Sequence, residues 1–155
     1  MAVRVEPAKP EHIALVLADV READVIELMD GWGKTPEQAM KTGLMVSALA
    51  WMAWIDEKPF CMFGVGSISL LSGYGIPWLV GTNQIDKHAK SFVRPCREYV
   101  LKMADLFPRM ENHVDARNTK VIKWLKMIGF RMNDPEPFGP KNLPFIRFEL
   151  KDYHV

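Results

Sequence analysis

Three neighbouring polar residues, Asp115, Arg117 and Asn118, lie between a short apolar strand and an amphipathic helix. A carboxylate at the end of a strand can act as a general base when burial tunes its pKa, so Asp115 is a candidate for proton transfer. A carboxylate in that place can also cap the following helix or pair with Arg117. Both interpretations of Asp115 stay open at the level of the sequence.

Other reactive residue types lack the partners that catalysis or metal binding would require. Cys61 and Cys96 have no His and Asp at a recognisable spacing, so nucleophilic catalysis by a thiolate is not expected. No metal site is predicted, because a metal-ligand spacing is absent among the four histidines, His12, His88, His113 and His154.

The helix after Asn118 must position these residues, and the run DARNTKVIKWLKMIGF encodes it clearly. Asn118 or Thr119 is suited to the N-cap, and Gly129 to a left-handed stop. Phe130 can then fold back on the last turn. The apolar face of this helix is expected to consist of Val121, Trp124, Leu125 and Ile128.

Hydrophobic periodicity predicts the other elements. Helices are expected over residues 10–20, 22–29 and 91–106. A further helix is expected to follow Thr35, which forms a capping box with Gln38. Strands are expected over 2–7, 48–55, 60–66, 76–81, 112–116, 131–134 and 145–150, with a Pro/Gly-rich loop over 134–144. Strands and helices alternate irregularly, which predicts an α+β class with a mixed α/β sheet. Strands 76–81 and 112–116 flank a helix and should pair in parallel.

Bulk composition limits the class of protein. The chain has 155 residues, of which 48% are hydrophobic and 25% charged, as expected for a single globular domain over 1–155. A net charge of +1 gives no reason to expect nucleic acid as a partner. No apolar run is long enough for a membrane span, and the N-terminus does not look like a signal peptide. Two cysteines without a disulfide pattern favour a reducing compartment.

The order of the elements, together with VDARNTKVIKWLKMIGF, resembles the GCN5-related N-acetyltransferase (GNAT) family. The matching positions are Val114, Asn118, Val121, Gly129 and Phe130. The resemblance implies a central twisted mixed sheet of about six to seven strands flanked by helices. It also implies that strands 76–81 and 112–116 splay apart, so that the pantetheine arm of acetyl-CoA can pair with exposed backbone like an added strand. The acetyl-CoA or CoA site implied in this way comprises Leu79, Val80, Gly81, Thr82, Gln84, Lys87, His88, Lys90 and Asn118.

Two positions depart from the family pattern. In the segment that corresponds to the pyrophosphate loop, QIDKHAKS, Lys87 stands at the first glycine position and Asp86 should repel a diphosphate. Lys87, His88, Lys90 and Arg94 could compensate with positive charge. The tyrosine that serves the family as general acid falls at Leu125, so Asp115 and Tyr99 remain as catalytic candidates, with no motif that places Tyr99 in the site.

A narrower resemblance is to GNAT-like phage proteins, which include internal virion proteins of short-tailed phages. The matching residues are Gly75, Pro77, Trp78, Leu79, Gly81, Thr82, Tyr99, Asn112, Asp115, Arg117, Asn118, Trp124 and Leu125. This resemblance implies a phage origin, a location in the host cytoplasm or in the phage particle, and other virion or host proteins, or a second copy, as partners.

Three functions follow from these observations. The main interpretation is a virion-associated or morphogenesis protein that keeps the GNAT fold with a degenerate acetyl-CoA site. The alternative is an active acetyl-CoA-dependent N-acyltransferase that modifies an amine on a host protein or a small molecule. The third is a small binding module that inhibits a host factor.

Overall fold

The computed structural model describes residues 2–67 and 70–153, which form one mixed sheet flanked by helices. The strands are β1 Val3–Pro7, β2 Ser47–Ile55, β3 Lys58–Gly66, β4 Tyr74–Gly81, β5 Arg109–Asp115, β6 Arg131–Phe138 and β7 Leu143–Lys151. The α-helices are α1 His12–Leu17, α2 Glu22–Trp32, α3 Pro36–Val46, α4 Gln84–Leu106 and α5 Thr119–Ile128. A short 3-10 helix, Leu70–Ser72, precedes β4.

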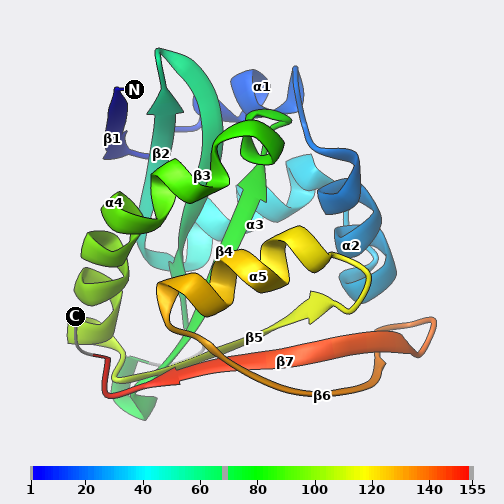
Figure 1. Cartoon of the computed structure of the whole chain (residues 1–155). Coiled ribbons are helices and arrows are strands. Elements are labelled where there is room, and N and C mark those ends of the chain that lie inside the picture. Colours follow the sequence, from blue (N-terminus) through cyan, green and yellow to red (C-terminus); the bar gives the residue numbers. More distant parts are fainter. Residues whose placement is uncertain (1, 68–69, 154–155) are drawn as a thin grey trace.

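The sheet has the order β1-β2-β3-β4-β5-β7-β6 and consists of two antiparallel halves. The halves meet at β4 and β5, which are parallel and pair only through Tyr74 with Arg109 and Gly75 with Met110. Beyond these residues the two strands diverge, as Figure 1 shows. The parallel pairing and the splay expected from the sequence are both present.

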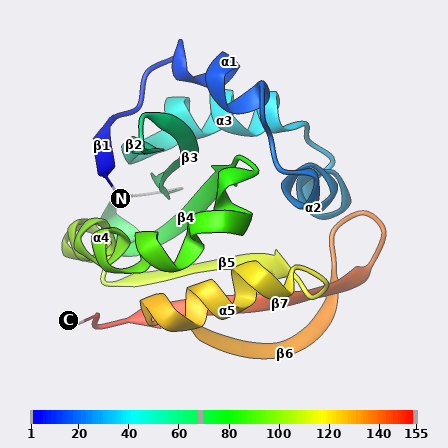
Figure 2. The same cartoon turned by 45° about the horizontal axis from the view of Figure 1, so that its top comes forward.

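Helices cover both faces of the sheet (Figures 1 and 2). α4 and α5 pack on one face, where they contact each other, the central strands and β6. α1 and α3 pack on the other face against β2, β3 and β4, while α2 contacts β5 and β7. The core is accordingly divided into a large apolar cluster under α4 and α5 and a smaller one under α1 and α3. The splay between β4 and β5 therefore has helices on each side.

Several local signals act as the sequence predicts. Thr35 caps α3, and Gln38 completes the capping box. The β2–β3 hairpin turns at Asp56 and Glu57, whose φ values of 49° and 62° are those of a tight turn that matches the twist of the strands. Gly129, with φ 128°, ends α5.

Two expected boundaries differ from the structure by more than a helical turn or a few strand residues. Helix α4 begins at Gln84 rather than at residue 91, because Ile85 lies two helical turns before Phe92 and extends the same buried stripe. The expected loop over 134–144 is mostly strand, because β6 continues to Phe138 and β7 begins at Leu143, with the turn starting at Gly139. Prolines are tolerated there because β6 is an edge strand, where a missing N–H breaks no ladder.

In the part of the chain that the structure describes, no helix is long and apolar enough to cross a bilayer. Cys61 and Cys96 are both buried and unpaired. No metal-binding group of His, Cys, Asp or Glu occurs among residues 2–67 and 70–153, and His154 lies outside these residues.

Candidate functional site

The splay between β4 and β5 contains a cavity of about 630 Å³ that reaches both faces of the sheet. Its wall on the α4/α5 side is apolar and includes Cys96, Val100, Trp124, Leu125 and Ile128. Its wall on the other side is formed by α2 and α3 together with Ile76 and Trp78 of β4. A molecule in this cavity would lie between the two halves of the sheet.

The edge of β4 that faces the splay exposes backbone hydrogen-bonding groups at Leu79. The Thr82 N–H donates to the Phe60 carbonyl of β3, at 2.9 Å between nitrogen and oxygen. Because alternate residues of a strand direct their N–H and C=O groups to opposite sides, Leu79 and Gly81 face the splay. The Gly81 groups are already engaged, since its N–H donates to Asp24 at 2.7 Å and its carbonyl accepts from the Arg21 N–H at 2.9 Å. Leu79 is thus the position where an extended ligand can pair with β4.

Asn112 closes the lower end of the splay. Its side-chain amide donates to the Pro77 carbonyl at 2.7 Å, and its amide oxygen accepts from the His113 N–H at 2.7 Å. Pro77 has no N–H to donate, and its carbonyl accepts from this side chain at a point where β4 and β5 no longer pair through their backbones. The cavity begins where this crosslink ends.

Glu27 of α2 is the carboxylate best placed for chemistry in the cavity. Its Oε1 accepts hydrogen bonds from the Asp115 N–H at 2.8 Å and from the Asn118 amide at 3.3 Å. Within the described residues, Oε2 has no hydrogen-bond partner, whereas every buried side-chain oxygen has one. Oε2 is therefore not fully buried, and it is accessible from the cavity that Glu27 lines. Burial raises the pKa of Glu27 to about 7, although the hydrogen bond from the Asp115 N–H opposes this shift. A carboxyl group with that pKa can accept and release a proton near neutral pH.

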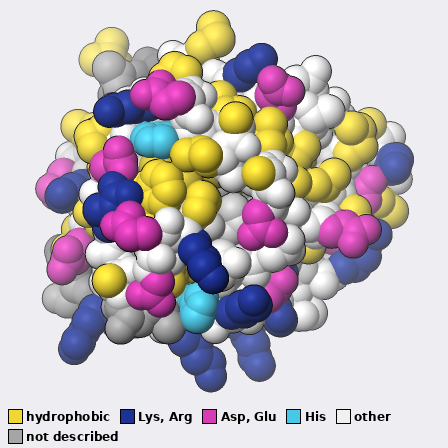
Figure 3. Space-filling view, turned by 90° about the horizontal axis from the view of Figure 1, so that it is seen from above, with side chains coloured by type: hydrophobic (Ala, Val, Ile, Leu, Met, Phe, Trp, Pro, Cys, Tyr) yellow, Lys and Arg dark blue, Asp and Glu magenta, His cyan; other side chains and the backbone are white. Residues whose placement is uncertain are grey.

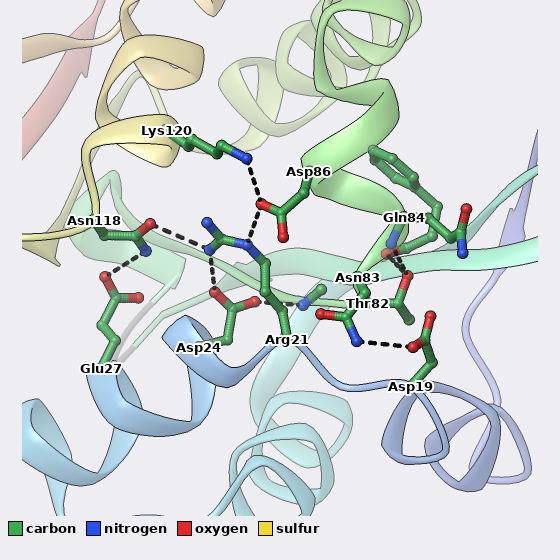
Figure 4. Close-up of polar contacts among 12 residues, drawn as sticks. Asp19, Arg21, Asp24, Glu27, Thr82, Asn83, Gln84, Asp86, Asn118 and Lys120 are labelled. Atoms are coloured by element: carbon green, nitrogen blue, oxygen red, sulfur yellow. Dashed lines mark hydrogen bonds and ion pairs between the residues drawn. The ribbon is translucent and has the colours of Figure 1, made fainter.

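A network of ion pairs joins α2, α4 and α5 at the upper end of the splay (Figure 4). Arg21, which is buried, contacts the carboxylates of Asp24 at 3.2 Å and Asp86 at 3.0 Å, and it donates to the Asn118 amide oxygen at 3.2 Å. Lys120 also pairs with Asp86, at 3.3 Å. Partial burial would raise the pKa of Asp86, but the contacts with Arg21 and Lys120 outweigh it and hold this pKa below its ordinary value. Asp86 is therefore an anion at the start of α4.

The solvent-facing sides of α4 and α5 are basic next to this network. The exposed cations in the first three turns of α4 and the first two turns of α5 are Lys87, Lys90, Arg94, Lys120 and Lys123. Viewed from the end of the molecule in Figure 3, basic and acidic side chains are interspersed over most of the face, and basic ones project along its lower edge. An anionic group would be attracted to that edge rather than to the face as a whole.

The two catalytic candidates from the sequence do not lie in the cavity wall. The Asp115 carboxylate is buried and bound to Arg117, with contacts of 3.0 Å to Nε and 2.6 Å to Nη2. Tyr99 packs against Trp51 and Phe63, with ring centroids 5.0 Å and 5.8 Å away. Neither residue is among those that line the cavity.

The residues predicted to bind the cofactor are only partly brought together. Leu79 lines the cavity, and Asn118 lies at its edge with its side chain between Arg21 and Glu27. Val80 is buried on the α1/α3 side. Thr82 is buried and its hydroxyl donates to the Pro59 carbonyl at 2.7 Å, which fixes β4 to β3.

The start of α4 differs from the loop that the resemblance implied. Gln84, Lys87, His88 and Lys90 lie on the first two helical turns. The first N–H groups of this helix are partly satisfied internally, since the Gln84 N–H donates to the Thr82 hydroxyl and the Ile85 N–H to the Thr82 carbonyl. Lys87 and Lys90 can attract an anion by charge, whereas the backbone is less free to cradle one.

Two further cavity residues limit the chemistry. Leu125 lines the wall, so its position offers no proton to a leaving group. Cys96 is also in the wall, but burial raises the pKa of its thiol to about 12, and the thiolate needed for nucleophilic attack is scarce. Among the carboxyl and thiol groups of the cavity, Glu27 is therefore the one that fits proton transfer.

Sequence reasoning missed Glu27. In the sequence it is an acidic residue within a predicted helix, a pattern typical of a solvated helix face. Its role depends on α2 packing against the carboxyl end of β5, which only the tertiary structure shows. The sequence contains one weak indication of a site at Glu27. Glu27 lies about one helical turn after Asp24, so both carboxylates project from one face of the helix.

No protein-family model and no curated protein sequence matches this chain. Solved structures do match it over nearly its whole length. An N-acetyltransferase from Staphylococcus aureus Mu50 superposes with a TM-score of 0.71 at 14% identity, covering 99% of this chain and 100% of that one. An acetyltransferase of the GNAT family from Streptococcus pneumoniae gives a TM-score of 0.63 at 12% identity, covering 96% and 98%. A spermidine N-acetyltransferase from Vibrio cholerae, in complex with CoA and spermine, gives 0.67 at 10% identity, covering 97% and 95%.

At these identities the likeness shows the fold. The chain has the GNAT acetyltransferase fold, with a seven-strand mixed sheet flanked by helices, as the sequence predicts. It is structurally similar to N-acetyltransferases, and a similar structure binds CoA.

Proposed function

We propose that this protein is an acyl-CoA-dependent N-acyltransferase in which Glu27 is the general base. One observation carries the proposal: a carboxyl group with a pKa of about 7 presents a free oxygen to a cavity that passes between two splayed parallel strands. Similar folds that carry out N-acetylation support the same reading. The acyl donor would enter from the α4/α5 side and the amine from the α2/α3 side.

The residues present fit an acyl-CoA at its thioester arm. Leu79 offers a backbone N–H and C=O to an extended amide chain, and the apolar wall of Val100, Leu125 and Ile128 suits a methylene chain. At the phosphate end, Lys87, Lys90 and Lys120 supply positive charge. Asp86 fits a phosphate group least well, because its carboxylate is already paired with the side chains of Arg21 and Lys120.

The bound donor supplies an activated acyl group as a thioester. Glu27 Oε2 accepts a proton from the incoming ammonium group, which leaves a neutral amine as the nucleophile. The amine nitrogen would form a bond to the acyl carbon as the carbon–sulfur bond breaks, and the nitrogen would then give up a second proton, which balances the proton that the departing thiolate takes up. The apolar walls exclude water from competing for the acyl group. Release of the product and loss of the proton from Glu27 to solvent restore the site.

A general acid is not essential in this scheme. An alkyl thiol has a pKa of about 8.5, so the departing thiolate is a good leaving group that can take a proton from solvent. The leucine at the position of the family's tyrosine is then compatible with turnover. Proximity of the amine and the thioester would supply most of the rate enhancement.

A second candidate is a virion-associated or morphogenesis protein of a phage that has lost acyl transfer. Leu125 in the cavity wall and the carboxylate of Asp86 beside the anion-attracting turns favour loss of activity. Its phage assignment is supported by the sequence resemblance alone. Its partners would be other virion or host proteins, or a second copy of the chain.

Calorimetric titration with acetyl-CoA and with free CoA separates the two candidates. The acyltransferase proposal expects binding at micromolar ligand, followed by release of free thiol when an amine is added. No binding at millimolar acetyl-CoA would overturn it. The search would then move to phage particles and protein partners.

A further inference from the structure

The acceptor half of the cavity has a distinct composition. The part that faces away from α4 and α5, here called the acceptor compartment, is lined by Leu28, Trp32, Lys34, Ala39, Thr42, Gly43, Val46, Ile76 and Trp78. Most of these side chains are apolar, and two are tryptophans that present flat faces and edges to a ligand.

The tryptophans are fixed by their surroundings. Trp78 donates from its indole N–H to the Ser47 hydroxyl at 2.7 Å. Its ring lies against α3 so closely that a Cβ on Gly43 would come within 2.6 Å of it. Trp32 packs edge-on against Phe138 and Phe145, with centroids 5.4 Å and 6.0 Å away. The shape of the compartment is therefore largely preformed.

Only one carboxylate oxygen is available to a cation in this compartment. Asp24 and Glu27 are the carboxylates that line the cavity within the described residues. Both oxygens of Asp24 are engaged, one by Arg21 at 3.2 Å and the other by the Gly81 N–H at 2.7 Å. This leaves Oε2 of Glu27. Lys34 adds a positive charge to the wall, which repels any second cationic group of a ligand.

We infer that the acceptor is a primary amine with a single positive charge and an aromatic or bulky aliphatic substituent. This inference rests on the proposed function and names its substrate class. The ammonium group would pair with Glu27, and the substituent would pack against Trp32 and Trp78. A polyamine or a polyhydroxylated amine would bury several polar groups against a wall that is mostly apolar, which is unfavourable.

Direct measurement of amine binding tests the inference without requiring turnover. The probes are 2-phenylethylamine, cadaverine as a diamine of similar length, and ethanolamine as a polar monoamine, each titrated calorimetrically into the protein at pH 8. We expect 2-phenylethylamine to bind at least about tenfold more tightly than the other two. Equal or tighter binding of cadaverine or ethanolamine, or no binding of 2-phenylethylamine, would overturn the inference.

A charge reversal at the compartment wall provides a matched comparison. Lys34→Glu should improve the affinity for cadaverine by about fivefold, because a new carboxylate can pair with the second ammonium group. Lys41→Glu makes the same charge change on α3, but Lys41 pairs with Glu37 and does not line the cavity, so the affinity should not change. Equal effects of the two variants would count against the inference.

The failures of the two proposals can be told apart by adding acetyl-CoA. If amides form but cadaverine is the better acceptor, the substrate class is wrong and the acyltransferase stands. If 2-phenylethylamine binds selectively but no amide forms, the compartment is assigned correctly and the acyltransferase reading fails.

Discussion

Glu27 owes its chemical character to its burial and to two hydrogen bonds rather than to its place in the chain. Glu27→Gln keeps an oxygen that can accept from the Asp115 N–H and the Asn118 amide, so the local fold should persist. The variant cannot accept a proton from an ammonium group, and we expect kcat to fall by at least about 100-fold. Steady-state acyl transfer measures this. Glu22→Gln, at an exposed residue of the same helix, is the control and should retain activity.

The raised pKa of Glu27 also predicts how stability depends on pH. Between the ordinary value of 4.5 and about 7, the folded chain binds a proton at this site that the unfolded chain has released. The contribution of Glu27 to folding stability therefore becomes less favourable as pH rises through this window. Relative to the parent, Glu27→Gln should become more stable as pH increases from 4.5 to 8. Thermal unfolding at several pH values tests this, and a difference in Tm that is independent of pH would contradict the pKa assignment.

At the scale of elements, the start of α4 places the carboxylate of Asp86 beside a helix N-terminus. This carboxylate competes with a bound phosphate for the cations of Arg21 and Lys120. Asp86→Asn removes the carboxylate that holds Arg21 and Lys120. We expect the affinity for CoA to increase about two- to fivefold, as for other partly exposed charges near a helix terminus. Asp105→Asn, at an exposed residue near the other end of α4, should leave the affinity unchanged. Weaker CoA binding by Asp86→Asn would show that the network supports the site instead.

The sequence predicts elements well where a local signal is complete. The capping box of Thr35 and Gln38, the stop at Gly129 and the β2–β3 turn are encoded within a few residues, and each is present. The second half of the strand β6, after the expected 131–134, was missed because its prolines suggest a loop unless the edge position of the strand is known. The start of α4 was missed because its polar residues hide the apolar spacing from Ile85 to Phe92.

The site could be predicted only in part, for the same reason. Leu79 and the splay follow from the family resemblance, which rests on the order of the elements and on the helix after Asn118. Asp115 looked reactive in the sequence, yet its carboxylate is taken by Arg117, two residues further on. Glu27 and Asp115 are far apart in the sequence, and their contact exists only because α2 packs on β5. Long-range packing of this kind leaves no pattern in a single sequence.

At the scale of the whole molecule, two sheet halves depend on very few bonds between β4 and β5. Asn112→Ala removes the side-chain bond to the Pro77 carbonyl, and we expect unfolding free energy to fall by about 1–3 kcal/mol. Asn133→Ala is a matched control, because Asn133 donates to the Arg147 carbonyl at 2.9 Å within one half of the sheet. Both variants should lose stability. Only Asn112→Ala should speed hydrogen exchange along β4 and β5 and weaken acyl-CoA binding, because the bond from Asn112 to the Pro77 carbonyl, and not the bond from Asn133, joins the two strands that form the splay. Identical exchange patterns in the two variants would mean that the packed helices, and not Asn112, hold the halves together.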